Sequence, residues 1–138
     1  MAFQFSAAVR NAAADAIETS IGTAPTLEIR TGAAPANCAA ADTGTVLSSM
    51  TLPSDWLGAA SSGAKTILGT WQDTSADASG TAGHFRIKAG ATCHVQGSVS
   101  QRAADGGTGD MQLDQATAAI VAGQQITVTA FTLTMGGA

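Results

Sequence analysis

The chain has 138 residues, a length that fits one domain with a single hydrophobic core. The hydrophobic fraction of 45% overstates that core, because 30 residues are alanine and only 24 are Leu, Ile, Val or Phe. Charged residues make up 12% of the chain and the net charge is −4, which argues against a nucleic-acid-binding protein and against a disordered chain. There is no apolar run of roughly 20 residues and no basic-then-hydrophobic leader, so we expect no membrane partner and folding in a cytoplasm.

One helix is predicted near the start of the chain. Ser6 has the residue type of an N-cap and Gly22 that of a C-terminal stop. Between them, apolar residues recur at helical spacing: Val9, Ala13, Ala16, Ile17 and Ile21. We expect this stripe to pack against a sheet or a partner, and we divide the single domain into an N-terminal arm and helix (residues 1–22) and a β-sandwich (residues 26–138).

Three strands are predicted in the first half of the remaining chain, at residues 27–30, 45–52 and 65–71. Residues 33–44 have no hydrophobic period and are predicted to form an irregular connection. Residues 72–83 contain no hydrophobic side chain larger than alanine, which predicts a polar surface loop.

Residues 84–99 are predicted to form a β-hairpin that turns at residues 89–91. A register with Lys88 opposite Thr92 gives one apolar face, formed by Phe85, Ile87, Cys93 and Val95. The other face is polar and is formed by His84, Arg86, Lys88, Thr92, His94 and Gln96. We expect the apolar face to lie on the core and the polar face to be the outer one.

Two further strands are predicted, at residues 110–114 and 124–135. The last one changes its apolar phase near Ala130, which indicates either a β-bulge there or a second half with both faces partly covered. Seven strands with one N-terminal helix predict a mainly β protein, an antiparallel, jelly-roll-like β-sandwich, with a closed barrel as the nearest competitor.

Residue types suited to zinc are present, but their spacing is poor. Cys93 and His94 are neighbours on a strand and point to opposite faces, and no C-x-x-C or H-x-x-x-H pattern includes Cys38 or His84. We therefore expect no metal and no other cofactor. The two cysteines are predicted to stay reduced, with Cys93 as a small buried hydrophobe and a Cys38–Cys93 disulfide as the alternative.

The glycine-rich stretch at residues 105–110 has the composition of a calcium or phosphate loop. Its spacing fits neither an EF-hand, a calcium-binding nonapeptide repeat nor a P-loop, so a plain connection is predicted. There is no G-x-S-x-G motif, and neither histidine is tied to a nucleophile by a recognisable pattern. The sequence therefore predicts that the chain is not an enzyme.

Several segments resemble a group of small virion proteins of tailed bacteriophages. They are Arg30-Thr31-Gly32 with Pro35-Ala36-Asn37, Gly44-Thr45-Val46-Leu47, Gly80-Thr81-Ala82-Gly83-His84-Phe85-Arg86, Gly123-Gln124-Gln125-Ile126-Thr127-Val128, and the alanine-rich residues 7–21. The resemblance implies a capsid cement (decoration) protein, a β-sandwich or jelly roll on the capsid surface of a virion, made in the bacterial cytoplasm. It implies the major capsid protein and further copies of the chain, as a homodimer or homotrimer, as partners, with no catalytic or ligand residues.

Two alternatives stay open. One is another small virion component, such as a head-completion, tail or fibre-associated protein. The other is a sandwich that binds calcium or a glycan through residues 72–83 and 101–109. If partner contacts use aromatic and arginine anchors, the candidate interface residues are Phe3, Phe5, Trp56, Trp71, Arg86, Phe131 and Leu133. For Trp56 a place in the core is the first interpretation.

Overall fold

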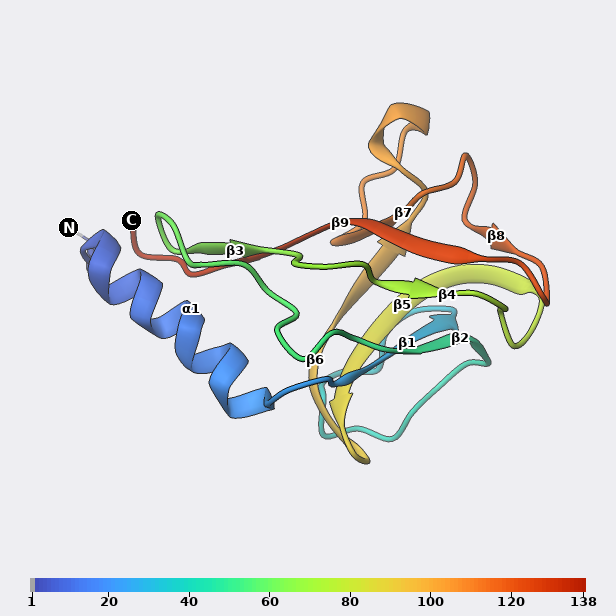
Figure 1. Cartoon of the computed structure of the whole chain (residues 1–138), viewed down its shortest axis with the longest axis horizontal. Coiled ribbons are helices and arrows are strands. Elements are labelled where there is room, and N and C mark those ends of the chain that lie inside the picture. The colour runs from blue at the N-terminus through green and yellow to red at the C-terminus, as the bar shows by residue number, and fades with distance from the viewer. Residues whose placement is uncertain (1) are drawn as a thin grey trace.

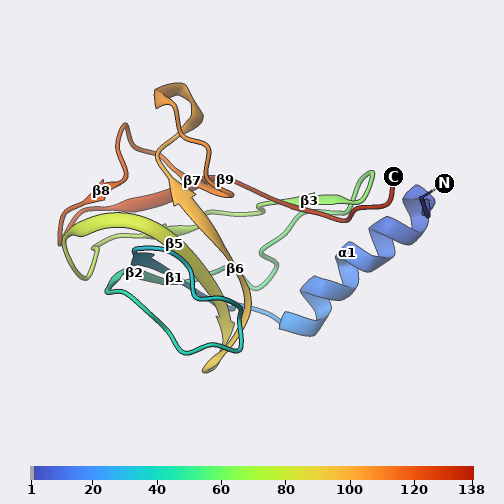
Figure 2. The same ribbon diagram turned by 180° about the vertical axis from the view of Figure 1, so that it is seen from behind.

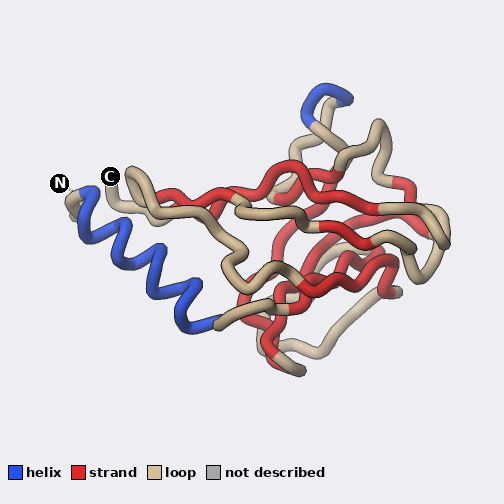
Figure 3. Tube along the Cα trace, in the orientation of Figure 1, coloured by secondary structure: helices blue, strands red, loops and turns tan. Residues whose placement is uncertain are grey.

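The computed structural model describes residues 2–138, which form one helix and a strongly curved set of strands (Figure 1). The elements are α1 (Ala7–Ile21), β1 (Thr26–Thr31), β2 (Val46–Thr51), β3 (Ala64–Thr66), β4 (Gln72–Asp73), β5 (Gly80–Ala89), β6 (Thr92–Ser100), the short 3₁₀ helix η1 (Ala103–Asp105), β7 (Met111–Leu113), β8 (Ala119–Ile120) and β9 (Ile126–Thr134). Loops of varied length join them (Figure 3). The expected mainly β class with an N-terminal helix is confirmed.

The strands follow one hydrogen-bonded path in the order β2-β1-β5-β6-β7-β9-β3. Off this path, β4 pairs with β9 and β8 pairs with β5. The path curls, and α1 lies at the β3 end of the molecule, away from β8 (Figures 1 and 2). Because β6 and β7 run parallel, the sheet departs from the fully antiparallel arrangement expected, and a jelly-roll arrangement stays a prediction.

The helix α1 begins and ends where the sequence predicts. The Ser6 hydroxyl accepts a hydrogen bond from the Val9 backbone N–H at 3.3 Å, which satisfies one of the free donors of the first turn. Gly22 has φ 95° and donates its N–H to the Glu18 carbonyl at 2.9 Å. Glycine suits this position because side chains disfavour positive φ.

An aromatic chain runs through the core. Ring centroids are 5.9 Å apart for Trp56 and Trp71, 5.7 Å for Trp71 and Phe131, and 5.6 Å for Phe131 and Phe85. Trp71 Nε1 donates to the Trp56 carbonyl at 3.2 Å, and Trp56 Nε1 donates to the Gly22 carbonyl at 3.1 Å. The two indole N–H groups therefore link the aromatic core to the C-terminal end of α1. The prediction that Trp56 lies in the core is confirmed.

The hairpin forms at the predicted turn, but the predicted register is wrong. Ile87 lies opposite Val95 and Lys88 lies opposite Cys93, with an irregularity between Ile87 and Lys88. The shift moves Cys93 off the apolar face and onto the side of the sheet that carries Arg86. The prediction of Cys93 as a core residue is therefore also wrong, because pairing near a tight turn tolerates a bulge that alternation does not reveal.

The phase change in the last strand comes from a bulge, one of the two predicted alternatives. Ala130 pairs with Gln112 and Val128 pairs with the next residue, Leu113, so Thr129 is the extra residue of β9. Val128 and Phe131 consequently both point into the core.

The region between residues 65 and 83 differs from the prediction in both directions, with less strand at its start and more strand in the expected loop. The strand expected at residues 65–71 is limited to β3, with an isolated bridge at Ile67, and the expected loop contains β4 and the start of β5. Ala76 is buried in the core. A small side chain therefore anchors this segment, which has no larger apolar residue.

Candidate functional site

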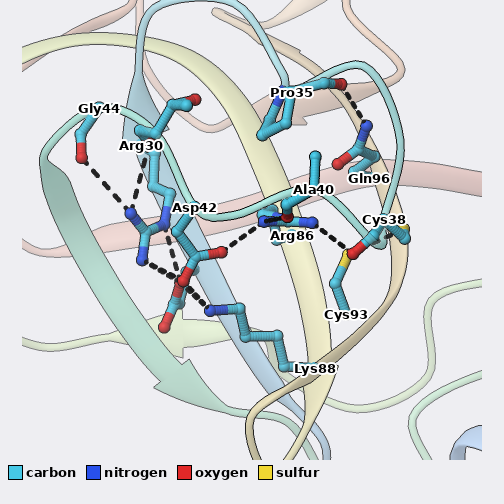
Figure 4. A network of polar contacts seen from close by, with 12 residues as sticks. Arg30, Pro35, Cys38, Ala40, Asp42, Gly44, Arg86, Lys88, Cys93 and Gln96 are labelled. Carbon is cyan, nitrogen blue, oxygen red and sulfur yellow. Dashed lines mark hydrogen bonds and ion pairs between the residues drawn. The ribbon is translucent and has the colours of Figure 1, made fainter.

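The polar face of the hairpin is covered by a loop. Residues 33–45, which we name the cover loop, cross this face of β5 and β6 (Figure 4). His84, Arg86 and Lys88 are buried, with 0%, 1% and 7% of their surface exposed. The expectation that they lie on the outer face is therefore wrong, because alternation along a strand cannot reveal that a distant loop folds over it.

Asp42 of the cover loop accepts hydrogen bonds from three buried cations. Arg86 Nη1 lies 2.5 Å from Asp42 Oδ1, Arg30 Nη2 lies 3.1 Å from Asp42 Oδ2, and Lys88 Nζ also donates to Oδ2 (Figure 4). Glu28 of β1 completes the set, 2.7 Å from Arg30 Nη2 and 3.1 Å from Lys88 Nζ. Burial of charge is costly unless it is paired, so these carboxylates make the buried cations tolerable.

Backbone carbonyls of the cover loop accept hydrogen bonds from the two terminal nitrogens of the Arg86 guanidinium, whereas its buried Nε has no hydrogen-bond partner among the described residues. Arg86 Nη1 donates to the Ala40 carbonyl at 3.1 Å and Nη2 donates to the Cys38 carbonyl at 2.8 Å. Gln96 Nε2 adds a bond to the Pro35 carbonyl at 2.7 Å. The irregular loop has no strand partner over this length, so these side chains on β5 and β6 fix its path.

The network shifts the pKa values of Asp42 and Lys88. The hydrogen bond from Lys88 is the main reason that the pKa of Asp42 lies below its ordinary value of 3.8, and Arg86 and Arg30 lower it further while burial opposes them. Burial alone lowers the pKa of Lys88, but its hydrogen bonds to Asp42 and Glu28 outweigh that effect and raise it. Asp42 and Lys88 are thus held in their charged forms at neutral pH.

The two cysteines meet beside Arg86. Cys38 lies in the cover loop and Cys93 on β6, and their Sγ atoms are 2.8 Å apart with both thiols free. They line an open pocket of about 400 Å³ together with Arg86, Thr92 and residues 39–42. This proximity agrees with the alternative pairing considered for the two cysteines, although no sequence spacing indicates it.

The residue types considered for metal ions are not brought together. His84 Nδ1 lies 2.9 Å from the Gly32 carbonyl, which only accepts, so the ring proton is on Nδ1, whereas His94 is exposed. Asp110 accepts from the backbone and hydroxyl of Ser98, both at 2.9 Å, and so has a structural use. Across residues 2–138 there is no group of three His, Cys, Asp or Glu side chains placed to hold a metal ion.

The helix α1 faces the body of the protein with polar side chains. Arg10 Nη1 donates to the Ser62 carbonyl and the Gly63 N–H donates to Asn11 Oδ1, both at 2.7 Å. Lys65, whose side chain is 5% exposed, lies 2.7 Å from Asp15 Oδ1 and 2.6 Å from Glu18 Oε2. The helix also turns aliphatic residues inward, with Ala14 and Ile21 buried and Ile17 packed against the core.

The opposite side of α1 is apolar and faces outward. We name the exposed side chains of Val9, Ala12, Ala13 and Ala16 the helix face. Val9 is 53% exposed, and Phe3, which precedes the helix, is 91% exposed. The predicted stripe is thus divided, because Val9, Ala13 and Ala16 are exposed and only its C-terminal part packs inward.

The seven candidate interface residues do not form one surface. Phe3 and Phe5 are exposed and Leu133 is half-buried. Trp56, Trp71, Arg86 and Phe131 are buried in the chain and so are not available to a partner in this conformation.

The sequence reasoning did not identify Asp42 and Glu28 as members of the buried network. Three basic residues on adjacent strands are a signal that acidic residues must lie nearby.

Comparisons with protein-family profiles, curated protein sequences and solved structures found no match to this chain. Among the described residues, no helix has the length and apolar character needed to cross a membrane.

Proposed function

We propose that the chain is a structural virion protein that binds the outside of an assembled phage capsid and joins neighbouring major capsid subunits. The likeness of its segments to small phage virion proteins supports the virion role. The observation that supports the binding surface is the first half of α1, where Arg10 and Asp15 bond to the protein body and Val9 and Ala13 are exposed. An amphipathic helix on a free-standing protein normally turns its apolar side inward, as this helix does only with Ala14, Ile17 and Ile21.

A partner that covers the helix face removes little polar surface from water. Its side chains carry no ionisable group, whereas Arg10, Asn11 and Asp15 are turned toward the protein body. Burial of the Val9 side chain and its alanine neighbours is therefore favoured without the desolvation of a charge. Exposed apolar surface rimmed by polar residues is typical of a protein contact.

Strand addition at the β2 edge of the sheet is less favourable than contact through α1. This edge is partly occupied, because the Leu47 carbonyl accepts from the backbone N–H groups of Asp77 at 2.8 Å and Ala78 at 3.4 Å. A partner strand would have to displace this segment.

The cement role follows from linkage. A protein that binds the assembled shell better than free subunits stabilises the shell, and many copies on a symmetric lattice make modest contacts sufficient. Self-association as a dimer or trimer stays a prediction within this proposal.

Cryo-microscopy of virions tests the proposal. Wild-type particles should carry the protein on the outer shell, and particles with the double substitution Val9→Asp and Ala13→Asp should lack it while the purified variant keeps its thermal unfolding midpoint. Val121→Asp is the matched control, because Val121 is 61% exposed but follows β8 at the end away from α1 (Figure 2).

Absence of the wild-type protein from the shell overturns the capsid role, and a low copy number per virion by quantitative mass spectrometry points to a head-completion or tail component. Normal decoration by the double variant overturns the assignment of the helix face.

A further inference from the structure

The structure places two thiols from distant parts of the sequence within bonding reach. Cys38 and Cys93 are 55 residues apart in the chain and their Sγ atoms are 2.8 Å apart. A disulfide requires about 2.05 Å between the sulfur atoms, so less than about 1 Å of approach is needed. Cys38 lies in the cover loop, which has no strand partner there, and this loop can supply the movement.

The position of Cys38 is held without the bond. Arg86 donates to the carbonyls of Cys38 and Ala40 on the same loop, so the thiol is already ordered over β6. The two sulfurs also line the open pocket of about 400 Å³, through which a small reagent reaches them. Order and access together are what disulfide exchange requires.

We propose that Cys38 and Cys93 form an intramolecular disulfide by exchange with a small-molecule disulfide such as oxidised glutathione, and that this bond fastens the cover loop over the buried cations. One protein thiolate attacks a sulfur of oxidised glutathione and releases the first glutathione thiolate. The second protein thiolate attacks the protein sulfur of the mixed disulfide and releases the other. The two cysteines are oxidised, oxidised glutathione is reduced to two thiols, and the two protons pass to the leaving thiolates.

The surroundings make this exchange slow at neutral pH. Burial is the main cause that raises the pKa of Cys38 to about 11, and the adjacent Cys93 adds to it, while Arg86 opposes the shift. Since the thiolate is the reacting form, the pair stays reduced during brief exposure and oxidises on long exposure or at alkaline pH. The bond therefore forms after folding, in a medium more oxidising than a cytoplasm.

The test uses the purified, reduced full chain incubated with oxidised glutathione. We expect loss of both free thiols, an intact mass lower by two hydrogen atoms, a Cys38–Cys93 linked peptide in a non-reducing digest, and a thermal unfolding midpoint raised by roughly 5–15 °C. Cys38→Ser and Cys93→Ser each leave one thiol, and each should acquire one glutathione without the rise in midpoint.

A chain unfolded in denaturant provides the second control, because there the two thiols are no longer adjacent and glutathione adducts should dominate. Glutathione adducts on both cysteines of the folded wild type, or disulfide-linked dimers in place of the internal bond, overturn the proposed pairing. An internal disulfide that leaves the unfolding midpoint unchanged overturns the fastening of the cover loop.

Discussion

Replacement of Asp42 by Asn tests whether the cover loop is held by charge. The substitution keeps the size of the side chain and removes the carboxylate that Arg86, Lys88 and Arg30 share. Loss of one partner from a buried ion pair costs about 3–5 kcal/mol, because the other charge is left uncompensated. The Asp42 side chain is 35% exposed, so water screens part of the loss, and we expect about 2–3 kcal/mol.

Urea unfolding followed by tryptophan fluorescence measures this loss, since both tryptophans are buried. The midpoint should fall by roughly 1–2 M, and the thermal midpoint by roughly 5–12 °C. Asp105→Asn is the matched control, because Asp105 pairs with Arg102 at the surface and its removal should leave the midpoint unchanged.

Acid titration gives an independent readout for Asp42. Its pKa in the folded chain lies below 3.8, so its contribution to stability is complete above that value and is lost as the pH falls through the lowered folded pKa. The difference in stability between wild type and Asp42→Asn should therefore narrow below pH 3.8. A loss smaller than about 0.5 kcal/mol at pH 7, or a difference that does not narrow in acid, would refute the electrostatic account.

Three further outcomes are expected in the same unfolding assay. Burial lowers the pKa of Lys65, but its hydrogen bonds to acidic residues of α1 outweigh this effect and raise the pKa above 10.5. Wild-type stability should therefore decline as the pH rises beyond 10.5, and Lys65→Met should show a smaller decline, because the raised pKa of Lys88 still contributes. Gly83→Ala should lower the free energy of unfolding by more than about 2 kcal/mol, because an added Cβ overlaps the Gly32 carbonyl. In Gly90→Ala the added Cβ meets no atom, so only the positive φ should cost stability, about 1 kcal/mol. Equal losses in the two variants would contradict this reasoning. Phe131→Ala should cost about 3–5 kcal/mol by leaving a cavity between Trp71 and Phe85, and a loss below about 1 kcal/mol would contradict the aromatic core.

Local signals in the sequence were sufficient for the helix and for the position of most strands. Ser6 and Gly22 act within a few residues of themselves, and the phase change near Ala130 reports a bulge in the same strand. Such features depend on neighbours in the chain, which a sequence displays directly.

The candidate site could not be predicted in the same way, because it depends on contacts between distant segments. Asp42 meets Arg86 across 44 residues, and Cys38 meets Cys93 across 55. The alternation of polar and apolar residues in β5 predicts one solvent-exposed face, but the cover loop buries that face. The orientation of α1 was likewise hidden, since its apolar stripe predicts packing without specifying what it packs against.

The pairing of the chain ends has a practical consequence for engineering. The Phe5 N–H donates to the Gly137 carbonyl at 2.6 Å, and both ends lie beside α1 (Figure 1). A reporter fused to either end would therefore sit next to the helix face and obstruct its partner. The exposed turn at η1 lies elsewhere on the molecule, so a peptide inserted after Asp105 would be displayed without crowding that surface, and joined termini would permit circular permutants opened at the same turn.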